Sequence, residues 1–137
     1  MNRDEAEARE QYADRYGLER RQVNDDIERA VIGGDWGASG YTTMAQADEL
    51  ADILALGPGR LLLDVGAGRG WPGLYLAKRT GCDALLTDLP LEGLRLARAR
   101  AAAEDVADQV RFAVASAAGL PLRPKSVDAV VSTDVLC

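Results

Sequence analysis

Short apolar runs alternate with longer amphipathic segments along the second half of the chain. Glycines, prolines or charged residues bound these runs, which is the pattern of buried strands, and the runs occupy residues 61–65, 84–87, 110–115 and 127–132. The segments 72–80 and 91–108 predict helices, with Pro72 in the first turn of the former and Gly81 after its end. The alternation predicts an α/β fold in which helices cover both faces of a parallel sheet through right-handed crossovers.

The first part of the chain is more polar. Residues 2–30 alternate in charge, and their few large apolar residues recur at roughly helical spacing, which predicts one or two amphipathic helices separated at Gly17. These apolar residues are Tyr12, Tyr16, Leu18, Val23 and Ile27. Such helices either lie on the domain with a solvated face or form a lid on the substrate side of a site.

A glycine-rich segment, residues 33–40, precedes a third helix. Trp36 and Tyr41 flank this segment, and they either close it over a ligand or pin it to the core. The helix is predicted to begin at Thr43, a capping residue, and to end before Gly57. Its predicted apolar face consists of Leu50, Ile53, Leu54 and Leu56. We expect a helical cap with the glycine-rich loop over residues 1–56 and a core over residues 57–137.

Composition excludes several kinds of chemistry. The chain has 137 residues, which suffices for one domain, and it contains no histidine. That absence excludes Ser-His-Asp and Cys-His catalysis and histidine-ligated zinc or haem. Lys+Arg 16 against Asp+Glu 22 gives a net charge of −6, which argues against binding along a nucleic-acid backbone. The two cysteines, Cys82 and Cys137, are too few for a disulfide framework or a four-thiolate zinc site, and no metal is predicted.

Targeting features are also absent from the sequence. The N-terminal residues lack the basic region and apolar run of a signal peptide, and no apolar stretch approaches the roughly 20 residues of a membrane span. The predicted location is therefore the cytoplasm. Cys82 stands at the start of a predicted strand and is expected to be an inert buried thiol.

A second glycine-rich loop follows the first predicted strand and precedes a helix. Its sequence is Asp64-Val65-Gly66-Ala67-Gly68-Arg69-Gly70, and glycines are needed where a backbone turns tightly and approaches a ligand without a Cβ. Asp88 ends the second strand, where a carboxylate accepts hydrogen bonds from both hydroxyls of a ribose. Together these features predict a nucleoside across the carboxyl ends of the two strands.

The glycine spacing bears on which nucleoside is bound. The dinucleotide fingerprint Gly-x-Gly-x-x-Gly fails when it is counted from Gly66, because its third glycine falls on Trp71. It matches from Gly68 through Gly70 and Gly73, a register that starts too far beyond the strand. An NAD-dependent oxidoreductase is kept as an alternative on this match.

Four segments resemble the motifs of one enzyme family. Residues 62–70 resemble the first motif of class I S-adenosylmethionine-dependent methyltransferases of the bacterial small-molecule type, and Leu86-Thr87-Asp88-Leu89 resembles the second. Residues 115–122 and 126–131 resemble the third and fourth, in matching order and spacing. The resemblance implies a Rossmann-like fold, S-adenosylmethionine as cofactor, and methyl transfer to a small-molecule or lipid-like acceptor. The family's reaction is an in-line displacement at the sulfonium methyl, which needs positioning more than acid–base help.

The same resemblance implies contacts to the cofactor. The glycine loop would lie against its methionine part, and Asp64 would anchor that loop, directly or through water to the amino group. Asp88 would hold the ribose, and Leu89 would pack against the adenine. Family members often carry an acid after strand three that binds the adenine amino group. This chain has Ser116 there instead, with the backbone of Ala117 to share the task, so weaker adenine recognition is expected.

The resemblance places further residues around the methyl group. Gly40-Tyr41-Thr42 would cover the cofactor, while Thr133 and Asp134 would face the transferred methyl. The full predicted cofactor-binding set is Tyr41, Asp64, Gly66, Ala67, Gly68, Gly70, Asp88, Leu89, Ser116, Ala117 and Thr133. No catalytic residue is assigned; Asp134 or a residue of the N-terminal cap is a candidate base.

Structural explanations compete with some of these roles. Asp64 could cap amides of its own loop, and Asp88 could cap the helix that begins near Pro90. Asp128 is predicted to be a strand-entry acid, and Trp71 a packing residue. A non-catalytic S-adenosylmethionine-binding module or an inactive methyltransferase fragment is the alternative function.

The chain length bears on the expected sheet. The family fold has seven strands, and this chain stops just after the fourth, so the strands are expected in the order 3-2-1-4 with the C-terminal strands missing. The strand 127–131 would then be an apolar open edge, which is a template for pairing. We expect a homodimer, a domain swap or aggregation through this edge, or else a piece of a longer protein.

Overall fold

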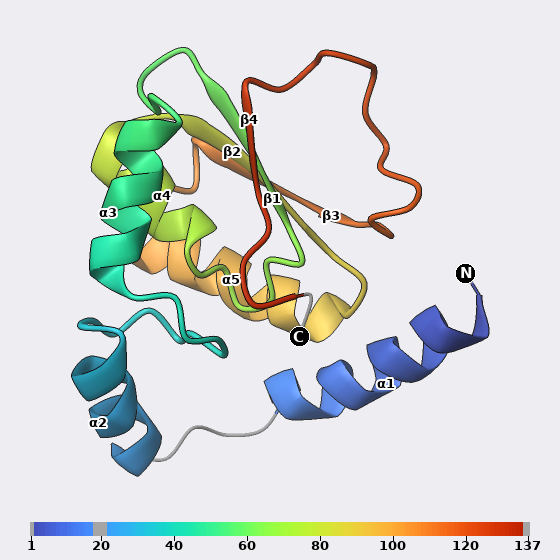
Figure 1. The fold of residues 1–137 in the computed structure, drawn as a ribbon. Coiled ribbons are helices and arrows are strands. Elements are labelled where there is room, and N and C mark those ends of the chain that lie inside the picture. Colours follow the sequence, from blue (N-terminus) through green and yellow to red (C-terminus); the bar gives the residue numbers. More distant parts are fainter. Residues whose placement is uncertain (1, 18–21, 136–137) are drawn as a thin grey trace.

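The computed structural model describes residues 2–17 and 22–135 (Figure 1), so Leu18 and Cys137 lie outside the described residues. Its elements, in chain order, are α1 (Arg3–Gly17), α2 (Gln22–Val31), α3 (Met44–Ile53), β1 (Leu61–Val65), α4 (Gly73–Thr80), β2 (Asp83–Asp88), α5 (Leu91–Ala103), β3 (Val110–Val114) and β4 (Ala129–Val131). Gly17 ends α1, which confirms the predicted pair of N-terminal helices.

The sheet has the order β3-β2-β1-β4 and is parallel throughout, as predicted. Leu62 of β1 stands in register with Ala84 of β2 and with Ala129 of β4. The crossovers from β1 to β2 and from β2 to β3 run in the same direction, and right-handed crossovers therefore place α4 and α5 on one face. Among the described residues the crossover helices therefore cover one face of the sheet, whereas the sequence predicted helices on both faces.

The core lies between the sheet and the two crossover helices. Leu62 and Leu86 point into it from the strands, Leu74 from α4 and Ala97 from α5, and all are fully buried. The opposite face is more open, since Val130 of β4 is 53% exposed. Cys82 is also fully buried at the start of β2, as predicted, and burial raises the pKa of its thiol.

Helix α3 begins as predicted, at a capping box. Thr43 Oγ accepts a hydrogen bond from the Gln46 N–H at 3.1 Å, and the Gln46 side chain accepts from the Thr43 N–H at 2.9 Å. The helix packs on α4 through small residues, Ala47 and Ala51. The predicted apolar face is wrong at Ile53, which is 70% exposed because the alanine side of the helix makes the contact.

Helix α5 is shorter than the predicted 91–108. It ends at Ala103 because Asp105 adopts a left-handed conformation, with φ 59°, and its N–H bonds to the Ala102 carbonyl at 3.3 Å. The Val106 N–H bonds to the Ala101 carbonyl at 2.9 Å, and Val106 itself is buried. This is the Schellman geometry, in which a left-handed residue closes the helix and an apolar residue packs behind it.

Strand β4 is also shorter than predicted. The ladder with β1 runs only over Ala129–Val131, whereas the sequence predicted 127–132. Asp128 accounts for the late start, because its carboxylate accepts a hydrogen bond from the Leu61 N–H at 2.8 Å. This contact confirms Asp128 as a strand-entry acid.

Helices α1 and α2 lie beyond the carboxyl ends of the strands (Figure 1). Helix α1 packs on α5, and its Tyr16 is buried. Val23 and Ile27 of α2 are 56% and 57% exposed, so the predicted apolar face of residues 2–30 is buried in α1 and not in α2. No helix in the described ranges is both long and apolar enough to cross a membrane.

Candidate functional site

The glycine loop after β1 is tied to the neighbouring strand. The N–H groups of Gly66 and Ala67 both donate to the Thr87 carbonyl of β2, at 2.8 and 3.0 Å. Gly68 then turns with φ 53°, and a Cβ at this position would come within 3.0 Å of the Tyr16 hydroxyl of α1. The loop therefore needs glycine both for its conformation and for the close approach of α1.

Asp88 joins this loop to the end of β2. Its Oδ2 accepts a hydrogen bond from the Gly68 N–H at 2.7 Å, and its Oδ1 accepts one from the Leu89 N–H at 2.8 Å. Burial raises the pKa of the carboxyl, while these two backbone bonds lower it. The alternative role as a helix cap is wrong, because Pro90 is the N-cap of α5 and no side chain caps it.

Asp64 is buried beneath the loop. Its Oδ2 accepts a hydrogen bond from the Gly73 N–H at 3.0 Å, so the acid anchors the first residue of α4 and not an amide of residues 66–70. Burial raises its pKa to about 8, with Asp88 adding to the rise and the Gly73 bond opposing it. Among the described residues Oδ1 has no hydrogen-bond partner, which leaves this buried oxygen for a water or a ligand.

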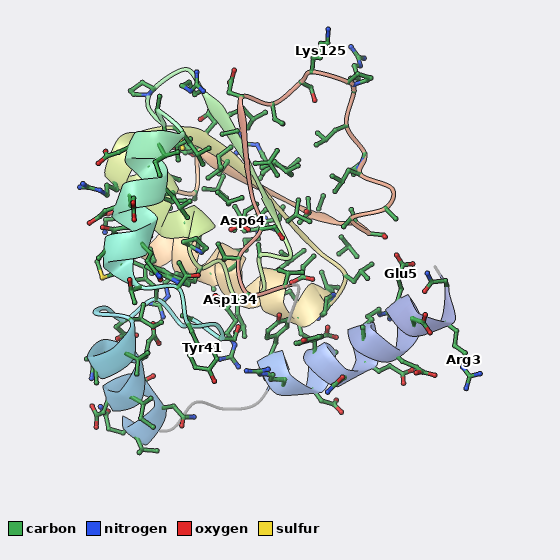
Figure 2. All side chains as sticks on the ribbon, in the orientation of Figure 1. Arg3, Glu5, Tyr41, Asp64, Lys125 and Asp134 are labelled. Carbon is green, nitrogen blue, oxygen red and sulfur yellow. The ribbon has the colours of Figure 1, made fainter. Side chains whose placement is uncertain are left out.

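The segment 40–42 forms a roof beside the end of β4. Asp134 Oδ2 accepts hydrogen bonds from the Tyr41 N–H, the Thr42 N–H and the Thr42 hydroxyl, at 3.1, 3.2 and 2.9 Å. Trp71 donates from its indole nitrogen to the Thr42 carbonyl at 2.8 Å. In Figure 2, Tyr41 and Asp134 lie close together between the sheet and the N-terminal helices.

The two aromatic residues that flank the first glycine-rich segment have different environments. Trp36 is buried and lies with its ring centroid 6.2 Å from that of Trp71 and 5.4 Å from that of Tyr75. It therefore pins the loop to the core. Tyr41 is 78% exposed and lines the cavity described below, which places it at the rim of the site. Trp71 is buried and packs, as predicted.

A cavity of about 200 Å³ lies over the glycine loop. Of the predicted cofactor-binding residues it brings together Tyr41, Gly66, Ala67, Gly68 and Thr133. The remaining six stand outside its lining, and they are Asp64, Gly70, Asp88, Leu89, Ser116 and Ala117. A second cavity, of about 390 Å³, lies between α2 and residues 38–41. The two cavities share Arg15, Ser39, Gly40, Tyr41 and Arg69, so they are adjoining parts of one hollow.

The end of β3 has an unforeseen partner. The Ser116 hydroxyl donates a hydrogen bond to the Glu5 carboxylate of α1, and the Ala118 N–H donates to Ser116 Oγ at 3.1 Å. Ala117, between them, is exposed. Glu5 carries no sequence signal for this contact, because it stands in a stretch of alternating charges.

Two further residues that sequence reasoning missed hold the N-terminal part in place. Arg69 donates to the carbonyls of Arg15 and Tyr16, at 3.0 and 2.9 Å, and thereby fixes the end of α1 to the glycine loop. Glu28 is buried, and its Oε1 accepts hydrogen bonds from the N–H groups of Trp36 and Ala38, at 2.6 and 3.3 Å. In the sequence nothing distinguishes Glu28 from its charged neighbours, and its burial becomes evident only in the structure.

Glu28 also belongs to a group of three carboxylates. Oxygens of Asp25, Glu28 and Asp35 lie within 4.8 Å of one another. Carboxylate oxygens suit Mg²⁺ or Ca²⁺, but the bonds from Trp36 and Ala38 already explain the position of Glu28. We therefore interpret Glu28 in this group as an anchor of the glycine-rich segment and not as a metal ligand.

The residues fit the implied cofactor at three points. Asp88 offers acceptors for ribose hydroxyls, Gly66 and Gly68 line a cavity, and among the described residues one buried oxygen of Asp64 has no hydrogen-bond partner. A cationic nucleoside suits the half-buried carboxylate of Asp88.

Comparison with known proteins agrees with this geometry. Residues 62–137 match a family described as "Methyltransferase domain". The chain is 36% identical over 96 residues to 27-O-demethylrifamycin SV methyltransferase from Amycolatopsis mediterranei. In structure it is similar to a SAM-dependent methyltransferase from Thiobacillus denitrificans in complex with S-adenosylhomocysteine, with a TM-score of 0.62 and 26% identity over 84% of this chain.

A third similarity concerns an enzyme with a known small acceptor. The geranyl diphosphate C-methyltransferase from Streptomyces coelicolor, in complex with Mg²⁺, geranyl diphosphate and S-adenosylhomocysteine, matches 90% of this chain with a TM-score of 0.66 and 25% identity. The match to the rifamycin enzyme covers 69% of this chain but only 35% of that enzyme's length. It spans 44% and 53% of the two solved chains.

Proposed function

We propose that this chain, which belongs to the class I S-adenosylmethionine-dependent methyltransferase family, binds S-adenosylmethionine and forms the cofactor half of an enzyme that methylates a small-molecule or lipid-like acceptor. One observation carries the proposal. The hydrogen bond from the Gly68 N–H to Asp88 joins the glycine loop and the acid of β2 in a single unit. Relatives named for a rifamycin and for geranyl diphosphate support the acceptor class.

The proposed cofactor contacts follow the carboxyl ends of the strands. The loop Gly66–Gly70 receives the methionine part, with Asp64 beneath it. Asp88 holds the ribose through oxygen lone pairs that remain beyond its two backbone bonds, because a carboxylate offers about four acceptor sites. Leu89 and the Ser116–Ala117 end of β3 receive the adenine. Tyr41 and Thr133 border the methyl group, because both line the cavity over the loop.

The second cavity is the proposed acceptor site. It adjoins the cavity over the glycine loop through Ser39, Gly40 and Tyr41, so an acceptor there would face the transferred methyl group. Ile27, Val31 and Ile32 supply apolar surface, while Arg15 and Arg69 supply positive charge at the boundary of the two cavities. This mixture suits an apolar molecule with a polar or anionic group.

Positioning is the proposed contribution of the chain to the chemistry. S-adenosylmethionine supplies a methyl group that its sulfonium already activates, and alignment of two reactants is worth up to roughly 7–11 kcal/mol. The Asp134 Oδ2 atom accepts three hydrogen bonds from residues 41 and 42, which supports a role in holding the roof. No residue is assigned as a general base.

Calorimetric titration of the 137-residue chain tests the cofactor. S-adenosylhomocysteine should bind, and NAD should not. Asp88→Ala should weaken binding at least tenfold, since it removes an ion-assisted contact worth about 1.5–3 kcal/mol, whereas the exposed control Asp52→Ala should not change it. Binding of NAD without S-adenosylhomocysteine would favour the oxidoreductase alternative and contradict the proposal.

Turnover separates an enzyme from a non-catalytic binding module. The chain is incubated with S-adenosylmethionine and candidate acceptors that combine an apolar body with a polar group, and S-adenosylhomocysteine is quantified. Product above the rate without acceptor supports methyl transfer. Tight binding without product for any acceptor supports the binding-module alternative.

We also propose that the edge of β4 pairs with a second copy of the chain. In the described residues β4 pairs only with β1, and Val130 at its centre is 53% exposed. An apolar strand with unpaired backbone groups is a template for another strand. Light scattering should give a dimer for the native chain and a monomer for Val130→Lys, and a monomeric native chain would contradict the proposal.

Three remaining proposals rest on sequence. The division into a cap over residues 1–56 and a cofactor-binding core over residues 57–137 follows the change in pattern near Gly57. The net charge of −6 supports the absence of a nucleic-acid partner. We propose the cytoplasm as the location, which fractionation of cells expressing the chain would test.

A further inference from the structure

The end of β3 receives a carboxylate from a distant part of the chain. The Ser116 hydroxyl gives its only proton to Glu5 Oε1, and it accepts the Ala118 N–H at 3.1 Å. Figure 2 shows Glu5 on α1 below the end of the sheet. With its proton used, Ser116 has one remaining lone pair, so Glu5 is the strongest acceptor at this strand end.

Glu5 is held in place by the start of its own helix. The Glu5 N–H donates to Asn2 Oδ1 at 2.8 Å, and the Asn2 N–H donates to Glu5 Oε2 at 3.0 Å. This reciprocal pair is a capping box, with Asn2 as the N-cap. One carboxylate oxygen therefore serves the helix, and the other faces Ser116. The hydrogen bond from Ser116 lowers the pKa of Glu5 and so favours its ionised form.

The other end of α1 is fixed as well. Arg69 of the glycine loop donates to the Tyr16 carbonyl at 2.9 Å, and Tyr16 lies against Gly68 and Gly93. Helix α1 thus spans the carboxyl edge of the sheet from the glycine loop to the end of β3. Glu5 reaches Ser116 as part of a helix that is anchored at both ends.

We propose that Glu5 selects the adenine base of the cofactor, by accepting a hydrogen bond from its exocyclic amino group beside Ser116. The inference rests on the proposed function. If Asp88 at the end of β2 holds the ribose, the base extends toward the neighbouring strand end, which is that of β3. Adenine presents an amino donor at C6, whereas hypoxanthine presents a carbonyl acceptor there. A carboxylate only accepts, so Glu5 favours the former and repels the latter.

The ratio of two affinities tests this selection. Calorimetry compares S-adenosylhomocysteine with its deaminated analogue, S-inosylhomocysteine, on the native 137-residue chain and on Glu5→Gln. Glutamine keeps the capping position, but it can donate to a carbonyl, so the preference for the adenine form should fall about tenfold or more. Glu7→Gln is the matched control, because Glu7 is exposed on the same helix and pairs with Arg3 at 3.0 Å.

Further outcomes separate Glu5 from its surroundings. Ser116→Ala should retain most of the preference, because the carboxylate remains within the capping box. An unchanged ratio in Glu5→Gln overturns the inference, and so does an equal loss for both ligands, which would show a purely structural role of α1. Loss of preference in Ser116→Ala alone would assign the selection to Ser116. A native chain that binds neither ligand overturns the proposed function itself.

Discussion

The carboxylate of Asp134 and the hydroxyl of Thr42 lie 2.9 Å apart although 92 positions separate them in the sequence. The same oxygen accepts the N–H groups of Tyr41 and Thr42. A Cβ on Gly40 would collide with the Asp134 carboxylate, so the segment passes the acid as closely as glycine allows. The roof of the site is therefore fastened directly to the chain that follows β4.

Removal of this acid should loosen the roof. Asp134→Ala leaves the amides of Tyr41 and Thr42 without their acceptor, and we expect their hydrogen exchange to accelerate at least tenfold. The global loss of stability should be about 1–3 kcal/mol or less, because the segment is partly exposed. Asp128→Ala is the control, since it removes the acceptor of the Leu61 N–H at the other end of the sheet. If the Tyr41 and Thr42 amides exchanged equally fast in both variants, Asp134 would not be what protects them.

Asp64 should make the folded chain less stable as the pH rises. Its pKa is raised by burial to about 8, so the folded state keeps a proton that the unfolded chain, with its ordinary value of 3.8, has released. Below about pH 4 both states hold the proton and the effect vanishes; above about pH 8 the destabilisation is complete. Between these limits the stability falls by up to about 1.4 kcal/mol per pH unit.

Asp64→Asn isolates this contribution. The amide oxygen still accepts the Gly73 N–H, but the group no longer titrates. We predict that the variant gains stability relative to the native chain from pH 5 to pH 8, and that the two curves run parallel at higher pH. Urea unfolding of both proteins at several pH values measures the difference. A difference that does not vary with pH would show that Asp64 is ionised in the folded state.

Asp88 should stabilise the fold as well as bind the cofactor. Asp88→Ala removes the acceptor of the Gly68 and Leu89 N–H groups, which we expect to cost about 1–3 kcal/mol in urea unfolding. Asp88→Asn can still accept one of these bonds, so it should lose roughly half as much stability as Asp88→Ala. The exposed Asp52→Ala should stay within about 0.5 kcal/mol of the native chain. Native-like stability in Asp88→Ala would indicate that water replaces the carboxylate at both amides.

The end of α5 offers a stabilising substitution. Asp105 holds the left-handed position of the helix end, with φ 59°, and glycine adopts this conformation without steric cost. We predict that Asp105→Gly raises the free energy of unfolding by about 0.5–1 kcal/mol. Asp108→Gly, nearby and exposed, should instead lower it, because there glycine only adds freedom to the unfolded chain. Thermal melts of the two variants should shift in opposite directions.

Alternation of apolar runs and glycines predicted the arrangement of the sheet well. The strand 61–65 is found at its predicted bounds, and the order β3-β2-β1-β4 follows from short right-handed crossovers. The end of α5 could not be predicted from the same pattern, because Asp105 takes the place that glycine usually occupies at a helix terminus. Nor could the exposure of Ile53, since the contact between α3 and α4 is made by alanines.

The candidate site was predictable where it is local in sequence. The glycine loop and Asp88 are one structural unit, as their positions at the carboxyl ends of two successive predicted strands indicated. Long-range contacts could not be predicted from the sequence. The partner of Ser116 is Glu5, which is 111 positions away, and nothing in the charged stretch around Glu5 distinguishes that acid. Asp64 was expected beneath the loop, yet its partner is Gly73, because a buried acid also satisfies the first amide of α4.

The aromatic cluster beneath the roof gives the chain an optical reporter. Both of its tryptophans, Trp36 and Trp71, stand in this one cluster, and Lys78 lies with Nζ 5.9 Å from the centre of the Trp36 ring. Because Trp71 also donates to the Thr42 carbonyl, the ultraviolet emission of the protein senses the docking of residues 36–42. Emission on ligand addition would therefore report the docking of residues 36–42 and the filling of the cavity that Trp71 lines, and it would be insensitive to events at the Ser116 end.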